Sequence, residues 1–99
     1  MNIQQENTSR GGRFFYNEHG RDLAEMDYTW RNGVMVILHT EVDPSLEGKG
    51  VGKALVNAAA ADARAGKYTI LPICAFAKAV MTKGDAYADV LDGGSASHG

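Results

Sequence analysis

The clearest pattern in the chain is a pair of strand-like segments on either side of Asn32-Gly33. Before this dipeptide, residues 24–31 alternate between apolar and polar side chains, which predicts a strand with one buried face. After it, residues 34–42 are apolar on both faces until His39, which predicts a central strand covered on both sides. Asn-Gly favours the positive φ angles of a two-residue turn, so the two segments are expected to form a tight hairpin.

A two-residue turn also fixes which residues face each other across the hairpin. The expected cross-strand pairs are Trp30–Met35, Tyr28–Ile37 and Met26–His39. Because cross-strand partners share one face of the sheet, this register places His39 on the better-buried face. It also places His39 near the end of its strand.

The remaining patterns predict one strand before this hairpin and three elements after it. They are a strand over 13–18, a helix over 50–65, a strand over 68–73 and a helix over 74–81. Seven alanines between positions 54 and 65 favour the first helix, and Gly66 is expected to end it. The order β-β-β-α-β-α predicts an α/β (α+β) fold with a mixed, mostly antiparallel sheet and two helices.

The length of 99 residues suits one domain. Residues 1–12 are polar and are expected to be a flexible lead-in, whereas 92–99 are rich in Gly and Ser and are expected to be a flexible tail. The domain itself is therefore expected over 13–91.

Composition and charge narrow the class of protein. Ten Lys and Arg against twelve Asp and Glu, scattered along the chain, argue against a dedicated nucleic-acid binder. The longest apolar run, residues 34–38, is far shorter than a membrane span. A single cysteine excludes an internal disulfide, and no cluster of His, Cys and carboxylates has the spacing of a metal site. We expect a small, soluble cytoplasmic domain, without a metal, that is a monomer or a weak homodimer.

Three glycines at alternate positions join the central strand to the first helix. Gly48, Gly50 and Gly52 allow the backbone to pass close to a ligand at a helix N-terminus, where free N–H groups bind phosphate. Lys49 and Lys53 add positive charge there. A plain flexible connection is the alternative. The spacing fits neither a Walker loop nor a dinucleotide-binding fingerprint.

The segment from Val42 to Leu55, VDPSLEGKGVGKAL, resembles the acetyl-CoA loop of the GCN5-related N-acetyltransferases. In that family the pattern is Gln or Arg, two residues, Gly, any residue, then Gly or Ala. Here it corresponds to Glu47, Gly50 and Gly52, with an acidic residue at the first position. Residues 38–42 and 70–76 extend the likeness. The whole of 13–91 resembles the small single-domain branch of the family, which has a cysteine after the last core strand.

This resemblance implies that acetyl-CoA binds between two splayed parallel strands, with its pyrophosphate on the glycine loop. The residues implied in cofactor binding are Thr40, Glu41, Val42, Glu47, Gly48, Lys49, Gly50, Val51, Gly52 and Lys53. Pro72 cannot donate a backbone hydrogen bond, so pairing between the two strands is expected to stop near it. A simple strand end is equally compatible with Pro72.

Cys74 and His39 are the candidate catalytic residues. Cys74 follows a strand and starts a helix, whose N-terminus favours a thiolate; the alternative is an inert core cysteine. His39 is a candidate general base because histidine titrates near neutral pH, and the alternative is a hydrogen-bonded structural role.

Three functions remain open on the sequence alone. The first is transfer of an acetyl group from acetyl-CoA to an amine. The second is a non-catalytic acyl-CoA-binding or regulatory module, and the third is an interaction domain with a structural glycine loop. Only the turn Asn17–Gly20 separates two predicted strands. The resemblance implies that larger family members have helices at this position, which help to form the acceptor pocket. We therefore expect an open acceptor face, suited to a bulky amine, including one carried by a protein.

Overall fold

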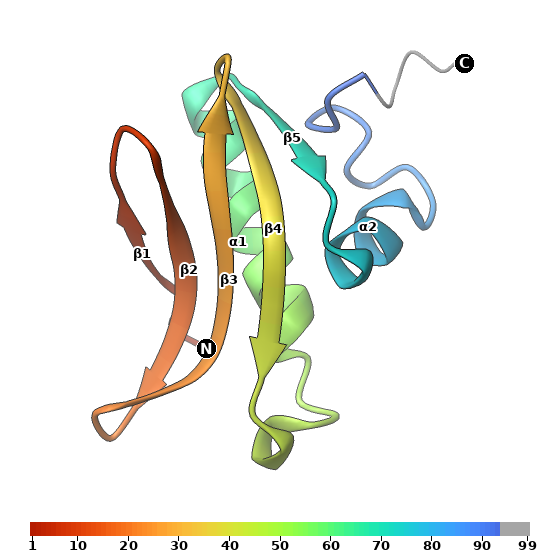
Figure 1. The fold of residues 1–99 in the computed structure, drawn as a ribbon. Coiled ribbons are helices and arrows are strands. Elements are labelled where there is room, and N and C mark those ends of the chain that lie inside the picture. The colour runs from red at the N-terminus through yellow and green to blue at the C-terminus, as the bar shows by residue number, and fades with distance from the viewer. Residues whose placement is uncertain (94–99) are drawn as a thin grey trace.

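Five strands form one mixed sheet in the computed structural model, which describes residues 1–93. In chain order they are β1 (Gln4–Asn7), β2 (Gly11–Glu18), β3 (Arg21–Arg31), β4 (Val34–Val42) and β5 (Thr69–Pro72). Strands that follow one another in the chain are neighbours in the sheet, and all pairs are antiparallel except β4 with β5. Figure 1 shows the sheet from β1 at one edge to β5 beside the C-terminal segment.

Two helices and one short 3₁₀ helix complete the fold. The 3₁₀ helix η1 (Pro44–Leu46) leads into α1 (Val51–Gly66), and α2 (Ala75–Thr82) follows β5. α1 runs along one face of the sheet, and α2 lies beside the end of β5 (Figure 1). The predicted fold class, a mixed and mostly antiparallel sheet with two helices, is confirmed.

The sheet has one strand more than the sequence pattern predicted. β1 lies within residues 1–12, where we expected a flexible lead-in, and β2 begins at Gly11. That prediction is therefore wrong for residues 4–7, 11 and 12. All four residues of β1 are exposed, so no apolar alternation marks the strand. The side chain of Asn7 ties β1 to the sheet, because its oxygen accepts hydrogen bonds from the Tyr28 hydroxyl and the Trp30 indole, both at 2.8 Å.

The hairpin between β3 and β4 has the predicted turn. Asn32 and Gly33 adopt φ angles of 53° and 77°, as a type I′ turn requires. The predicted pairs Trp30–Met35 and Tyr28–Ile37 are both present.

Farther from the turn, a β-bulge changes the register of this hairpin. β4 has one extra residue, Leu38, between Ile37 and His39, so His39 pairs with Asp27. The predicted pairing of His39 with Met26 is therefore wrong, and Thr40 pairs with Met26 instead. Because a bulge reverses the alternation of side chains, it moves His39 off the buried face.

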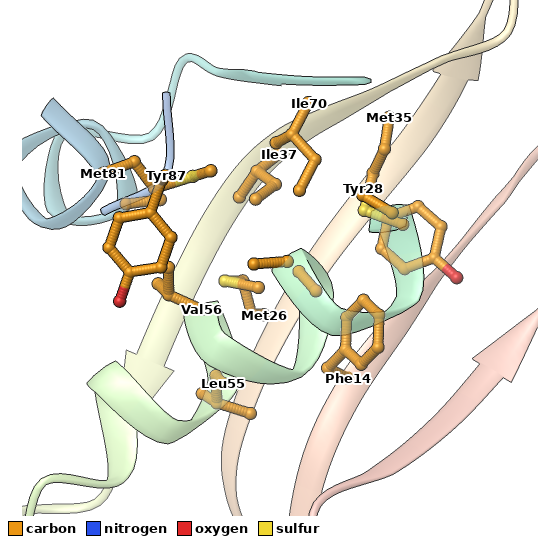
Figure 2. Packing of buried hydrophobic residues seen from close by; sticks show 14 of the residues in the cluster. Phe14, Met26, Tyr28, Met35, Ile37, Leu55, Val56, Ile70, Met81 and Tyr87 are labelled. Carbon is orange, nitrogen blue, oxygen red and sulfur yellow. The ribbon is translucent and has the colours of Figure 1, made fainter. Parts of the chain in front are cut away.

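The core lies between α1 and one face of the sheet. Its largest fully buried side chains come from the sheet and both helices: Met26, Met35, Ile37, Leu55, Ile70, Met81, Val51 and Val56. Figure 2 labels all of these except Val51. Three of the six buried residues of α1 are alanines, which lets the helix approach the strands closely. The expectation that β4 is covered on both faces holds only in part. Val36, on the opposite face, is 2% exposed, but it lies outside this cluster, and its neighbour Leu71 is 39% exposed.

The end of α1 differs in detail from the prediction. The helix includes Gly66, and Lys67 takes the left-handed position after it with φ 59°. A Cβ atom on Gly66 would lie 2.9 Å from the ring of Tyr68, so the glycine is needed for packing rather than for the turn.

The C-terminal segment runs back along β5. Ile70 donates its N–H to Val90 O at 2.7 Å, and Asp92 donates its N–H to Ile70 O at 2.8 Å. The predicted tail over 92–99 thus begins in contact with the sheet, and residues 94–99 lie outside the described residues. In residues 1–93, no helix has the length and apolar character needed to cross a membrane.

Candidate active site

The parallel strands β4 and β5 part at Ile37 and Pro72. These two residues form the last pair of the ladder, and Ile37 O accepts the N–H groups of both Ile73 and Cys74 at 3.1 Å. Beyond this point β4 continues to Val42 with no strand on that side among residues 1–93. Pairing stops at Pro72, where the sequence predicted it would. The open stretch of β4, residues 38–42, is called the free edge of β4 below.

Cys74 lies at this split, as the N-cap residue of α2. Its Sγ is 3.3 Å from Oγ1 of Thr40 on the free edge of β4. Burial raises the pKa of the thiol, but the Thr40 hydroxyl and the N–H groups of Ala77, Phe76 and Thr40 favour the thiolate. Together these groups bring the Cys74 pKa below its ordinary value. The structure therefore brings two of the predicted site residues, Cys74 and Thr40, into contact.

His39 lies on the other face of the sheet. Its side chain is 62% exposed, and its Nε2 is 3.4 Å from Oε2 of Glu41. Thr40, between them in sequence, pairs with Met26 of the core, whereas His39 and Glu41 pair with Asp27 and Glu25. The expectation that His39 lies on the buried face is wrong, and the side chain that meets Cys74 is that of Thr40.

The glycine loop leaves the N-terminus of α1 open. Gly48 and Gly50 have φ angles of 80° and 74°, and a Cβ atom on either would have no heavy atom within 4 Å. Gly50 is the N-cap of α1 and provides no capping side chain; the first helical bond runs from Ala54 N–H to Gly50 O. The N–H groups of the first turn thus lack helical acceptors. This open backbone fits an anionic group such as a phosphate.

The side chains around the loop differ in exposure: the charged ones are exposed and Val51 is buried. Lys49 and Lys53 are exposed and add positive charge near the start of α1, and Glu47, at the end of η1, is exposed as well. Val51 is buried in the core, so only its backbone is available to a ligand. Val42 is 36% exposed at the end of the free edge.

Gly52 has a different role from the two other loop glycines. It lies within the helix, and a Cβ atom there would be 2.5 Å from Cζ of Phe76 in α2. The Phe76 side chain is 42% exposed although it is aromatic. Phe76 is not marked as a site residue by the sequence, because its only signal is an aromatic residue two positions after Cys74.

An acidic groove lies where the start of β3 meets the end of β4. Its cavity measures about 470 Å³, and four of its lining residues carry carboxylates: Asp22, Glu25, Glu41 and Asp43. Arg13 bonds to two of them, Asp22 and Glu25, both at 2.7 Å. No sequence pattern marks this groove, because its carboxylates come from both strands of the hairpin and from the turn after it.

Comparisons with known proteins identify the family. A model of the GCN5-related N-acetyl-transferase family matches residues 13–90. Among solved structures, the chain is similar to the solution structure of a "GCN5-like putative N-acetyltransferase" from Staphylococcus aureus. The two are 34% identical, with a TM-score of 0.68, and the match covers 92% of this chain and 89% of that chain. No match was found among curated proteins. The chain belongs to the GCN5-related N-acetyltransferase family.

Proposed function

We propose that this chain is an N-acetyltransferase that takes an acetyl group from acetyl-CoA and transfers it to an amine. The observation that carries the proposal is the contact between Cys74 Sγ and Thr40 Oγ1, at the point where β4 and β5 part. Phe76, two residues after Cys74, touches the first turn of α1 at Gly52. A thiol with a lowered pKa therefore lies close to a helix N-terminus that fits phosphate.

Different parts of the chain are proposed to bind different parts of acetyl-CoA. Acetyl-CoA supplies the acetyl thioester. The free N–H groups at the start of α1, assisted by Lys49 and Lys53, bind its pyrophosphate. The free edge of β4 offers backbone groups to the pantetheine arm. Of the edge residues, Thr40 and Val42 face the same side as α1, so they are the side chains available to the cofactor.

Cys74 is the proposed nucleophile. Its thiolate forms a bond to the acetyl carbonyl carbon, and CoA leaves as a thiolate that takes up a proton. The acceptor amine then attacks this acetyl group, loses its proton and frees the Cys74 thiol. The Thr40 N–H, which points toward the sulfur, is the proposed donor to the developing oxyanion. His39 and Glu41 lie on the other face of the sheet from Cys74, so the amine's proton is proposed to pass to the departing Cys74 sulfur rather than to His39.

The acceptor is proposed to be a cationic amine that approaches over the open face of the sheet. The acidic groove includes Glu41 and Val42 at the end of the free edge of β4, past which the amine would reach Cys74. An amine is protonated at neutral pH before it reacts. β2 and β3 are joined by the two-residue turn His19–Gly20, so no helix covers the groove from that connection. The groove is therefore open to a lysine side chain or chain terminus of a protein.

Calorimetry with CoA, followed by a thiol-release assay with acetyl-CoA, tests this function. We expect CoA to bind and acetyl-CoA to release free thiol steadily only when an amine, such as a lysine-containing peptide, is present. Tight binding without amine-dependent release would support the second function, a non-catalytic acyl-CoA-binding module. No CoA binding at all would support a plain interaction domain. Mass spectrometry of the purified protein would detect CoA that co-purifies with it.

Reversing one charge in the groove tests the acceptor. Glu41→Lys is expected to raise the KM for a cationic peptide about three- to tenfold at low salt, because it replaces attraction by repulsion. The effect should shrink at high salt, and the affinity for CoA should stay the same. Asp85→Lys, the same change at an exposed residue after α2, is the control and should leave KM unchanged. Equal KM values in both variants would exclude the groove as the acceptor site.

A further inference from the structure

The contact between Phe76 and Gly52 joins the first turns of the two helices. The Phe76 ring covers the position where a Cβ atom of residue 52 would be, with ring carbons at 2.5, 2.9 and 3.3 Å from it. Contacts under 3.0 Å are shorter than real Cβ atoms make, so any residue but glycine at 52 displaces the ring or the helix. The ring is thus packed directly on the backbone of α1.

Backbone conformation gives no reason for a glycine at position 52. Unlike Gly48 and Gly50, Gly52 does not have a positive φ, and it lies inside α1, where alanine is the better helix former. Its role is therefore to leave space for the Phe76 ring. That ring remains 42% exposed and is not part of the buried core cluster.

The backbone of the same phenylalanine lies at Cys74. The N–H groups of Phe76 and Ala77 are among those that lower the pKa of the thiol. On its other side, Cys74 is held to β4 by its own N–H, which bonds to Ile37 O at 3.1 Å. Phe76 therefore contacts the phosphate-binding end of α1 with its ring and the reactive sulfur with its backbone.

We propose that Phe76 is a positioning residue that couples the glycine loop to Cys74. Its ring on Gly52 fixes the spacing between the N-termini of α1 and α2, and it thereby keeps the Phe76 N–H directed at the sulfur. The proposal rests on the proposed function in that it assigns CoA to the loop and reactivity to Cys74. It adds that the loop and the thiol form one unit, so that a change at residue 52 alters the chemistry of residue 74.

A double-mutant cycle with Gly52→Ala and Phe76→Leu tests this coupling. The two readouts are the pH profile of Cys74 alkylation by iodoacetamide and the melting temperature. Gly52→Ala alone is expected to raise the Cys74 pKa, slow alkylation at pH 7 by about threefold, as a half-unit shift does, and lower the melting temperature. In the Phe76→Leu background, the same Gly52→Ala change is expected to raise the melting temperature and to leave alkylation unchanged.

Gly66→Ala is the matched control. It also adds a Cβ atom inside α1, against the ring of Tyr68 at 2.9 Å, but at the opposite end of the helix. It should lower the melting temperature and leave the alkylation profile of Cys74 as in the parent. If Gly52→Ala behaves like Gly66→Ala, or if the two changes in the cycle are additive in both readouts, Phe76 does not couple the loop to Cys74.

Neither readout requires CoA, so the results can contradict the coupling without contradicting the proposed function, and the reverse. If the parent protein binds no CoA but the cycle is non-additive, the function is wrong and the coupling stands. If the parent binds CoA, its affinity in Gly52→Ala becomes a third readout. A loss of about threefold or more, absent in Gly66→Ala, would extend the coupling to the cofactor.

Discussion

Replacing Cys74 by Ser is expected to abolish acetyl transfer while leaving CoA affinity nearly unchanged. A serine hydroxyl has almost the shape of the thiol but is not ionised at neutral pH, so the rate should fall at least about 100-fold. The fold should survive, because serine is a favourable N-cap residue and residue 74 is the N-cap of α2. Amine-dependent thiol release and calorimetry with CoA measure the two quantities.

The pH profile of alkylation separates a reactive Cys74 from an inert one. Because the pKa of the folded protein's thiol is lowered, the thiolate is present at a pH where a free cysteine is still protonated. Thr40→Val removes the hydroxyl at 3.3 Å and should shift this profile to higher pH, whereas Thr40→Ser should not. Acetyl-CoA should protect Cys74 from alkylation. Unchanged turnover in Cys74→Ser would remove the cysteine from the mechanism and leave direct attack by the amine.

The predictable part of the fold is the part encoded by neighbouring residues. Asn32-Gly33 specifies its own turn, and that turn fixes the register close to it. Five residues after Gly33, the register depends on the bulge at Leu38. A continuous apolar run carries no mark of such a bulge, because every residue in it is acceptable on either face. His39 was misplaced for this reason. β1 was missed for a related one: its four side chains are all exposed, so no pattern records its pairing with β2.

The same distinction holds for the candidate site. The glycine loop and Cys74 could be identified because each is marked locally, by glycine spacing and by a position between a strand and a helix. Phe76 could not be identified, because its role depends on its contact with Gly52. Gly52 lies 24 positions earlier and comes near Phe76 only when both helices pack on the sheet. Long-range packing also explains why two glycines of one loop differ. Gly50 is needed for its φ angle, whereas Gly52 is needed for a neighbour's ring.

A second large effect is expected at Gly50, the N-cap of α1. Gly50→Val should lower CoA affinity about tenfold or more, because the side chain fills the open space beside the first N–H groups of the helix. It also carries a conformational cost of about 1–2 kcal/mol, since a β-branched residue is strained at φ 74°. A loss of CoA binding by itself would therefore leave two explanations, a blocked site and a weakened fold.

Gly33→Val in the β3–β4 turn separates these two explanations. Gly33 has φ 77° and, like Gly50, no heavy atom within 4 Å of an added Cβ, so the strain and the available space are matched. Both variants should lose a similar amount of stability in chemical denaturation, and only Gly50→Val should lose CoA affinity in calorimetry. If both variants bind CoA as the parent does, the pyrophosphate is not held at the start of α1. If both lose affinity equally, binding follows global stability, and the loop has no direct contact with the cofactor.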